Sequence, residues 1–79
     1  MMTLKILSPD KELYSGKIKK GEFPGAEGRF QILPGHAPLC TELVKGTIHY
    51  TDNESKSASI DLESALLKVS NNVITVLVN

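Results

Sequence analysis

The sequence predicts an all-β fold, a small flattened antiparallel β-sandwich or barrel of roughly eight to ten short strands. Three observations predict it. Apolar residues recur at a period of two and almost nowhere at helical spacing. Turn-forming residues separate the alternating runs, and a chain of 79 residues has room for one domain only, residues 1–79. Short strands joined by tight turns are typical of small sandwiches and barrels.

The first alternating run, TLKILS, places Leu4 and Ile6 on one face of a strand. Pro9 and Asp10 then supply a turn. The same alternation predicts further strands in YSGKIKK, GRFQIL, TIHYT and ASIDL, at residues 14–20, 28–33, 47–51 and 58–62. Each of these strands has one apolar and one polar face, so each is expected to bury only one side.

Turn residues lie between these runs. Gly25 and Gly28 bracket an Ala-Glu tip, and TDNES separates two alternating runs. Asn71 and Asn72 suit the positive φ angles of a tight hairpin. These positions indicate that most strands are joined directly to their neighbours.

One predicted strand, NVITVLVN, is apolar on both faces. Ile74, Val76 and Val78 share one face, and the other carries Val73, Thr75 and Leu77. One interpretation is a central strand whose second face is covered within the domain. The other is that the outer face belongs to a protein interface, because contiguous exposed apolar patches on soluble domains usually mark partners.

Composition excludes several classes of function. Nine basic residues balance nine acidic ones, so no strong field draws the chain to nucleic acid or anionic lipid. No apolar run approaches the roughly 20 residues of a membrane span, and the N-terminal run is too short for a signal peptide. We therefore expect a soluble cytoplasmic chain with no nucleic-acid partner and no direct membrane insertion.

External stabilisation is expected to come from a partner. A single core of this size supplies only roughly 3 to 5 kcal/mol. Cys40 is the only cysteine, which excludes an internal disulfide. His36, His49 and Cys40 show no metal-ligand spacing, so neither a metal nor a cofactor is expected.

Residues 34–38, PGHAP, form a corner that presents a lone histidine, His36. A histidine held in place could act as a general base, but only Cys40 and Thr41 lie near it as nucleophiles. No orienting acid stands at an obvious position. A structural or interface role is therefore the favoured interpretation, and no catalytic residue is expected.

Two other motifs have some features of ligand-binding sites. The glycines of GAEGRF lack the Lys-Ser or Lys-Thr pair and the following helix of a phosphate loop. Lys17, Lys19 and Lys20 form a small basic cluster without interleaved aromatics. A solvated strand face is the favoured interpretation of the cluster, and an acidic groove on a partner is the alternative.

Four segments in a fixed order resemble the N-terminal domain of the epsilon subunit of F-type ATP synthase. They are SPDKELYSGKIKK, GAEGRFQILPGHAPL, LVKGTIHY and NNVITVLV. The similarity runs from about Leu4 to Val78, and PGHAPL is its most specific part.

This resemblance implies a non-catalytic subunit in the central stalk of a proton-translocating rotary enzyme. It implies a peripheral location on the cytoplasmic side of the bacterial plasma membrane, through the complex. It implies contact with the gamma subunit, for which we consider Val73, Thr75 and Leu77. It also implies contact with the c-ring of the membrane sector, and the corresponding loop residues are Glu27, Gly28, Arg29, Gly35 and His36.

The sequence departs from this family in three places. Relatives commonly continue into a C-terminal helical pair that inhibits hydrolysis and sometimes binds ATP, whereas this sequence stops at Asn79, so neither property is expected. Arg29 stands where relatives often carry an acidic or small residue. LESALLKV, residues 62–69, lacks a paired glycine found in many relatives, which puts the local turn in doubt.

Two functional hypotheses from different classes follow. The favoured one is a rotor subunit that joins gamma to the c-ring. The other is a stand-alone β-sandwich binding or adaptor module that shares only the architecture, because fold does not fix function.

Overall fold

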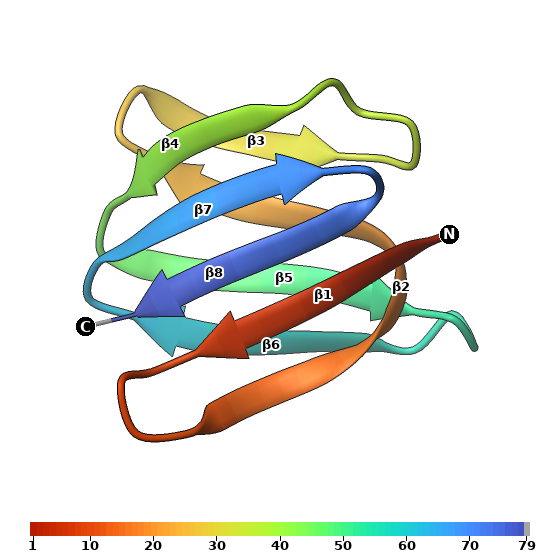
Figure 1. The fold of residues 1–79 in the computed structure, drawn as a ribbon, viewed down its shortest axis with the longest axis horizontal. Coiled ribbons are helices and arrows are strands. Elements are labelled where there is room, and N and C mark those ends of the chain that lie inside the picture. The colour runs from red at the N-terminus through yellow and green to blue at the C-terminus, as the bar shows by residue number, and fades with distance from the viewer. Residues whose placement is uncertain (79) are drawn as a thin grey trace.

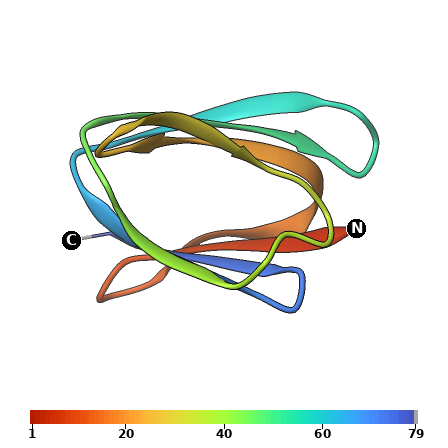
Figure 2. The ribbon, with the colours of Figure 1, turned by 90° about the horizontal axis from the view of Figure 1, so that it is seen from above.

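The computed structural model describes residues 1–78, and its eight strands confirm the all-β prediction. The strands are β1 (Met2–Leu7), β2 (Glu12–Gly25), β3 (Gly28–Ile32), β4 (Leu39–Leu43), β5 (Gly46–Asp52), β6 (Ser57–Leu62), β7 (Ala65–Ser70) and β8 (Val73–Val78). They form one sheet that curls into two facing layers (Figure 1, Figure 2). No helix in these residues is long and apolar enough to cross a membrane.

The 14-residue strand β2 belongs to both layers. Its first half pairs with β1, and its second half pairs with β3 and β5. The register with β5 shifts between Ile18 and Lys20, and an irregularity of this kind bends a strand. Figure 2 shows β2 passing from the lower layer to the upper one.

The front layer in Figure 1 contains β1, β8, β7 and β4, and the rear layer contains β3, β5 and β6. Gly25 of β2 pairs with Leu43 of β4, which joins the layers a second time. Seven strand pairings are antiparallel, but β1 and β8 run parallel. The sheet is therefore antiparallel, as predicted, except at this one pairing, where the first and last described strands are neighbours.

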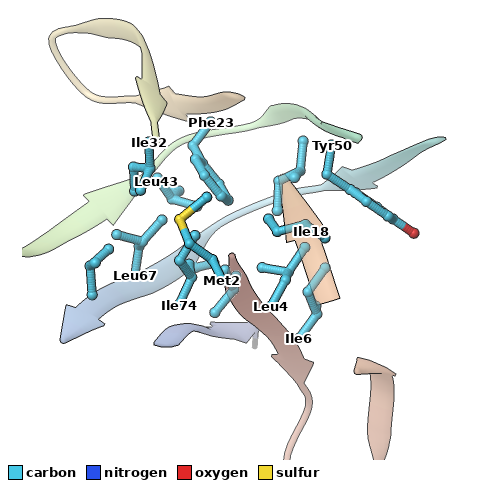
Figure 3. Close-up of a cluster of buried hydrophobic side chains, with 14 of the residues drawn as sticks. Met2, Leu4, Ile6, Ile18, Phe23, Ile32, Leu43, Tyr50, Leu67 and Ile74 are labelled. Carbon is cyan, nitrogen blue, oxygen red and sulfur yellow. The ribbon is translucent and has the colours of Figure 1, made fainter. Parts of the chain in front are cut away.

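The core lies between the two layers and is entirely apolar. Its larger members come from both layers (Figure 3) and include Met2, Leu4, Ile6, Ile18, Phe23, Ile32, Ile48, Leu67, Ile74 and Val76. No polar or charged residue of the described chain is buried. Burial of apolar surface is thus the main stabilising term.

Two aromatic pairs extend this core. The rings of Tyr14 and Tyr50 lie 4.8 Å apart, and those of Phe23 and Phe30 lie 5.8 Å apart. Burial, with the neighbouring Tyr14 as a further cause, raises the pKa of Tyr50 above its ordinary value of 10.0. The neutral phenol is therefore the form that the fold favours.

The predicted turns are confirmed. Asn71 and Asn72 adopt positive φ angles of 52° and 61° between β7 and β8, as a tight hairpin requires. Ala26 and Glu27 form the tip between β2 and β3, and Gly28 follows with φ of 123°. Only glycine adopts such a φ without strain.

Candidate functional site

Four of the five residues expected at the c-ring contact surround one hollow. We call it the tip hollow; it has a volume of about 520 Å³ and is lined by residues of β3, of β4 and of the β2–β3 turn. Its lining contains Glu27, Gly28, Arg29 and His36, together with Gly25, Ala26, Phe30, Leu39 and Thr41. Gly35 lies in the adjoining corner and does not line the hollow.

Arg29 is held at the edge of the tip hollow by contacts with the rear layer. Its Nη1 donates a hydrogen bond of 2.9 Å to the backbone carbonyl of Thr47. Its Nη2 lies 4.0 Å from the Oε1 of Glu22, and both side chains are close to half exposed. An ion pair so exposed adds little stability. The Arg29 guanidinium is therefore only weakly paired and can contact a partner at the surface.

The PGHAP corner is fixed by a backbone turn and by a distant asparagine. The amide of His36 donates to the carbonyl of Leu33 at 3.2 Å. Gly35, with φ of 84°, donates its backbone N–H to the Oδ1 of Asn72 at 2.8 Å. Asn72 also accepts, through its backbone carbonyl, the amide of Thr3 at 2.9 Å. One residue of the β7–β8 turn thus joins the corner to the start of β1.

His36 is exposed, and its contacts suit a surface residue. Its Nδ1 lies 2.7 Å from the carbonyl of Ala37, so Nδ1 carries the proton and donates. No carboxylate orients the ring among its hydrogen bonds in residues 1–78. The same part of the chain contains no group of three His, Cys, Asp or Glu residues that could hold a metal ion.

The outer face of β8 carries the three residues expected at the gamma contact. Val73 and Thr75 are half-buried, and Leu77 is 46% exposed. β8 lies centrally between β1 and β7, but no further layer covers this face within the described residues (Figure 2). The alternative in which the domain covers its second face is therefore wrong.

The three lysines of the basic cluster contact different parts of the domain. Lys17 donates to the hydroxyl of Thr3 on β1 at 3.0 Å. Lys19 donates to the hydroxyl of Ser55, between β5 and β6, at 2.6 Å. Lys20 lines a polar hollow on the outer face of the rear layer. This dispersal favours the interpretation as a solvated surface.

Sequence reasoning missed the residues that adjoin β8. Leu7 and Leu66 lie on either side of Leu77, and Lys5 and Lys68 lie on either side of Thr75. These residues become neighbours only through strand pairing. A partial signal exists in ALLKVS, where Leu66 and Lys68 alternate with buried residues, although the adjacent Leu66 and Leu67 obscure it.

The comparison with protein families matches the chain over its full length. The model of the β-sandwich domain of ATP synthase delta/epsilon chains covers residues 1–79. The chain belongs to this family.

The sequence of this chain is similar to those of ATP synthase epsilon chains. The chain is 39% identical over 74 residues to that of Lawsonia intracellularis, covering 94% of this chain and 55% of the relative. It is 36% identical over 76 residues to that of Leptospira borgpetersenii, covering 96% and 59%. The chain thus spans little more than half the length of these relatives.

Solved structures of ATP synthases contain the same fold. A chain of the Euglena gracilis mitochondrial ATP synthase, solved with its c-ring, superposes with a TM-score of 0.88 at 15% identity, over 98% of this chain and 49% of that one. A chain of the Tetrahymena thermophila central stalk and c-ring superposes with a TM-score of 0.80 at 14% identity, over 98% and 62%. At these identities the likeness establishes the fold.

Proposed function

We propose that this chain is a non-catalytic domain of the central stalk of a proton-translocating F-type ATP synthase, where it couples the gamma subunit to the c-ring during ATP synthesis. Membership of the delta/epsilon family supports the proposal. The two similar solved chains come from assemblies that include a c-ring. In such an assembly the chain is peripheral to the membrane, on the cytoplasmic side of a bacterial plasma membrane.

The observation that carries the proposal is the separation of two candidate surfaces on one core. The tip hollow is lined by β3, β4 and the β2–β3 turn, and the outer face of β8 lies on the front layer. In the proposed arrangement the tip hollow and the corner meet the c-ring, and Val73, Thr75 and Leu77 meet gamma. A coupling element needs two such surfaces with a well-packed core between them, because packed interiors transmit strain.

Binding of the purified gamma subunit tests this proposal. A partner that binds only the folded chain stabilises it by about 2.7 kcal/mol at a hundredfold excess over Kd. The melting temperature of the chain is therefore expected to rise with gamma concentration. An unchanged melting temperature at saturating gamma, with no co-elution, would favour the alternative of a stand-alone binding or adaptor module.

A further inference from the structure

The backbone of strand β6 is paired on one side only. β6 lies at the edge of the rear layer, and β5 is its single neighbour in the sheet of residues 1–78 (Figure 1). The register between the two strands continues into their turn, where the amide of Asp52 donates to the carbonyl of Lys56 at 2.8 Å. Residues 52 and 56 are therefore a hydrogen-bonded pair, and this pair sets the pattern for the whole ladder.

The pattern decides which backbone groups of β6 are free. Hydrogen-bonded and non-hydrogen-bonded pairs alternate along an antiparallel ladder, so residues 58, 60 and 62 bond to β5. The residues between them direct their N–H and C=O groups away from β5, where the described chain offers no partner strand. These residues are Ser57, Ser59 and Asp61.

No feature of β6 blocks the addition of another strand. Edge strands are usually protected by lysine, by proline or by a bulge. The sequence of β6, SASIDL, contains neither lysine nor proline, and its register with β5 is unbroken. Two other segments with a single partner among residues 1–78 do carry basic residues: the start of β2 carries Lys17, and β3 carries Arg29. β6 is therefore the edge best suited to accept a strand.

The sandwich is open to solvent beside β6. A hollow of about 250 Å³ lies there, and its apolar lining comes from both layers: Ile6, Leu13, Ile48, Ile60, Leu62 and Val78. Leu13 is 44% exposed, so the core is not closed at this edge. Alternate side chains of a strand added to β6 would point to this inner side and would remove apolar surface from water.

The outer side of β6 is polar. Ser57, Ser59 and Asp61 are exposed there. The hydroxyl of Thr47 on β5 donates to Oδ1 of Asp61 at 2.7 Å, which holds the carboxylate on this face. Its Oδ2 has no hydrogen bond within residues 1–78 and can accept one from a serine hydroxyl. The edge thus carries both the donor and the acceptor that a second copy of itself would need.

We propose that β6 pairs antiparallel with β6 of a second copy of this chain, which gives a two-fold dimer with a sheet continuous across both copies. The axis is perpendicular to the sheet at Ser59. Ser59 pairs with Ser59 of the second copy, and Ser57 pairs with the second copy's Asp61. Each pair exchanges both backbone hydrogen bonds. The inference goes beyond the proposed stalk function, because β6 carries none of the residues assigned to gamma or to the c-ring.

Backbone and charge together favour this register over its neighbours. Only residues that face away from β5 can lie on such an axis. Centring the pair on Asp61 would place two carboxylates opposite each other, and like charges directly opposite destabilise a strand pair. Centring it on Ser57 would place Ser59 opposite Ser55, whose φ of 66° is not that of an extended strand. The register centred on Ser59 avoids both faults.

Sedimentation equilibrium of the full chain between about 10 μM and about 1 mM tests this inference, because so short an interface associates weakly. The mean mass of wild type should rise from that of one chain toward that of two. Ser59→Lys places two lysines opposite each other on the axis, so association should weaken at least tenfold. Ser57→Lys makes the same charge change opposite the second copy's Asp61. This variant should associate at least as tightly as wild type at low salt.

Gln31→Lys is the matched control, because it adds the same charge at an exposed position of β3 in the same layer. Its association should equal that of wild type, and circular dichroism melting checks that every variant is folded. Hydrogen exchange locates the contact. The amides of Ser57 and Ser59 should be protected only at high concentration, whereas those of Ala58 and Ile60 should be protected at every concentration.

Three results would overturn the inference. The first is a single-chain mass of wild type at every concentration. The second is equal association of the Ser57→Lys and Ser59→Lys variants. The third is association that leaves the Ser59 amide unprotected, because the contact would then lie elsewhere. The stalk function is tested separately by gamma binding, so none of these results decides it.

Discussion

The side-chain oxygen Oδ1 of Asn72 accepts the backbone N–H of Gly35 at 2.8 Å, across 37 residues of sequence. This hydrogen bond ties the β7–β8 turn to the corner that presents His36. In the proposed assembly it connects the strand at the gamma contact with the loop at the c-ring contact. It also gives the corner a fixed position that its own residues do not supply.

Replacing Asn72 by glycine isolates this hydrogen bond. Glycine adopts the φ of 61° freely, so the turn and the backbone bond from Thr3 should persist while Oδ1 is lost. We expect faster hydrogen exchange at the Gly35 amide and a loss of about 1 kcal/mol in unfolding free energy. Asn71→Gly is the control, because it changes the adjacent turn residue and keeps the bond. Equal exchange at Gly35 in both variants would show that Asn72 does not fix the corner.

Arg29→Glu separates the fold from the proposed c-ring contact. The variant loses the hydrogen bond to the Thr47 carbonyl and places a carboxylate near Glu22. Because the site is exposed, the unfolding free energy should fall by no more than about 1 kcal/mol. Attachment to the c-ring should weaken, since charge reversal at an interface changes both affinity and salt dependence.

Proton-driven ATP synthesis in reconstituted vesicles measures this effect, with hydrolysis by the detached catalytic head as the reference. Synthesis should fall while hydrolysis is retained, and Lys56→Glu should affect neither. Unfolding of the Arg29 variant would give Arg29 a structural role. Wild-type synthesis at all salt concentrations would move the c-ring contact away from the tip hollow.

Leu66 and Leu67 are adjacent in β7, but truncation of their side chains should change stability by very different amounts. Leu67 is fully buried, whereas Leu66 is 41% exposed on the outer face. Leu67→Ala should lower the unfolding free energy by about 3 kcal/mol, within the usual range for a cavity in a core. Leu66→Ala should change it by less than about 0.5 kcal/mol. Urea unfolding of the two variants checks this, and similar losses would contradict the assigned faces of β7.

Tyr50 is expected to make stability fall at alkaline pH. Its pKa is raised in the fold by burial and by Tyr14, so the unfolded chain loses the phenolic proton first. The contribution is complete below about pH 10 and is lost as pH rises through the folded pKa. Tyr50→Phe removes this titration, so its unfolding free energy should decline less than that of wild type between pH 9 and about pH 11. Parallel declines in urea unfolding would exclude Tyr50 as a cause.

The sequence predicts well those strands that have one solvent-exposed face, because the alternation of apolar and polar residues shows directly which side faces the core. It identifies β4 and β7 poorly. In β7 an exposed leucine, Leu66, precedes the buried Leu67 and obscures the period of two. In β4 the short run LCTEL follows Pro38 and carries only Leu43 as a fully buried residue.

Strand neighbours are less predictable than strands. Periodicity shows that residues 73–78 are apolar on both faces, but not that β8 lies beside β1 in parallel register. The loop residues around the tip hollow could be named from the sequence because they lie close together in it or carry the family motif, whereas the hollow itself could not. The row formed by Leu7, Leu77 and Leu66 and the bond from Gly35 to Asn72 depend on pairings between strands and turns, which local patterns do not encode.

The parallel pairing of β1 with β8 has a consequence for synthesis on the ribosome. β1 emerges first, yet one of its two neighbours is the last strand of the fold. Until residues 73–78 leave the exit tunnel, β1 presents an unpaired edge, and the core beneath Leu4 and Ile6 lacks Ile74 and Val76. Folds dominated by such non-local contacts form slowly and expose aggregation-prone edges meanwhile. The nascent chain is therefore expected to need protection by a chaperone up to the final strand and to become protease-resistant abruptly once that strand is released.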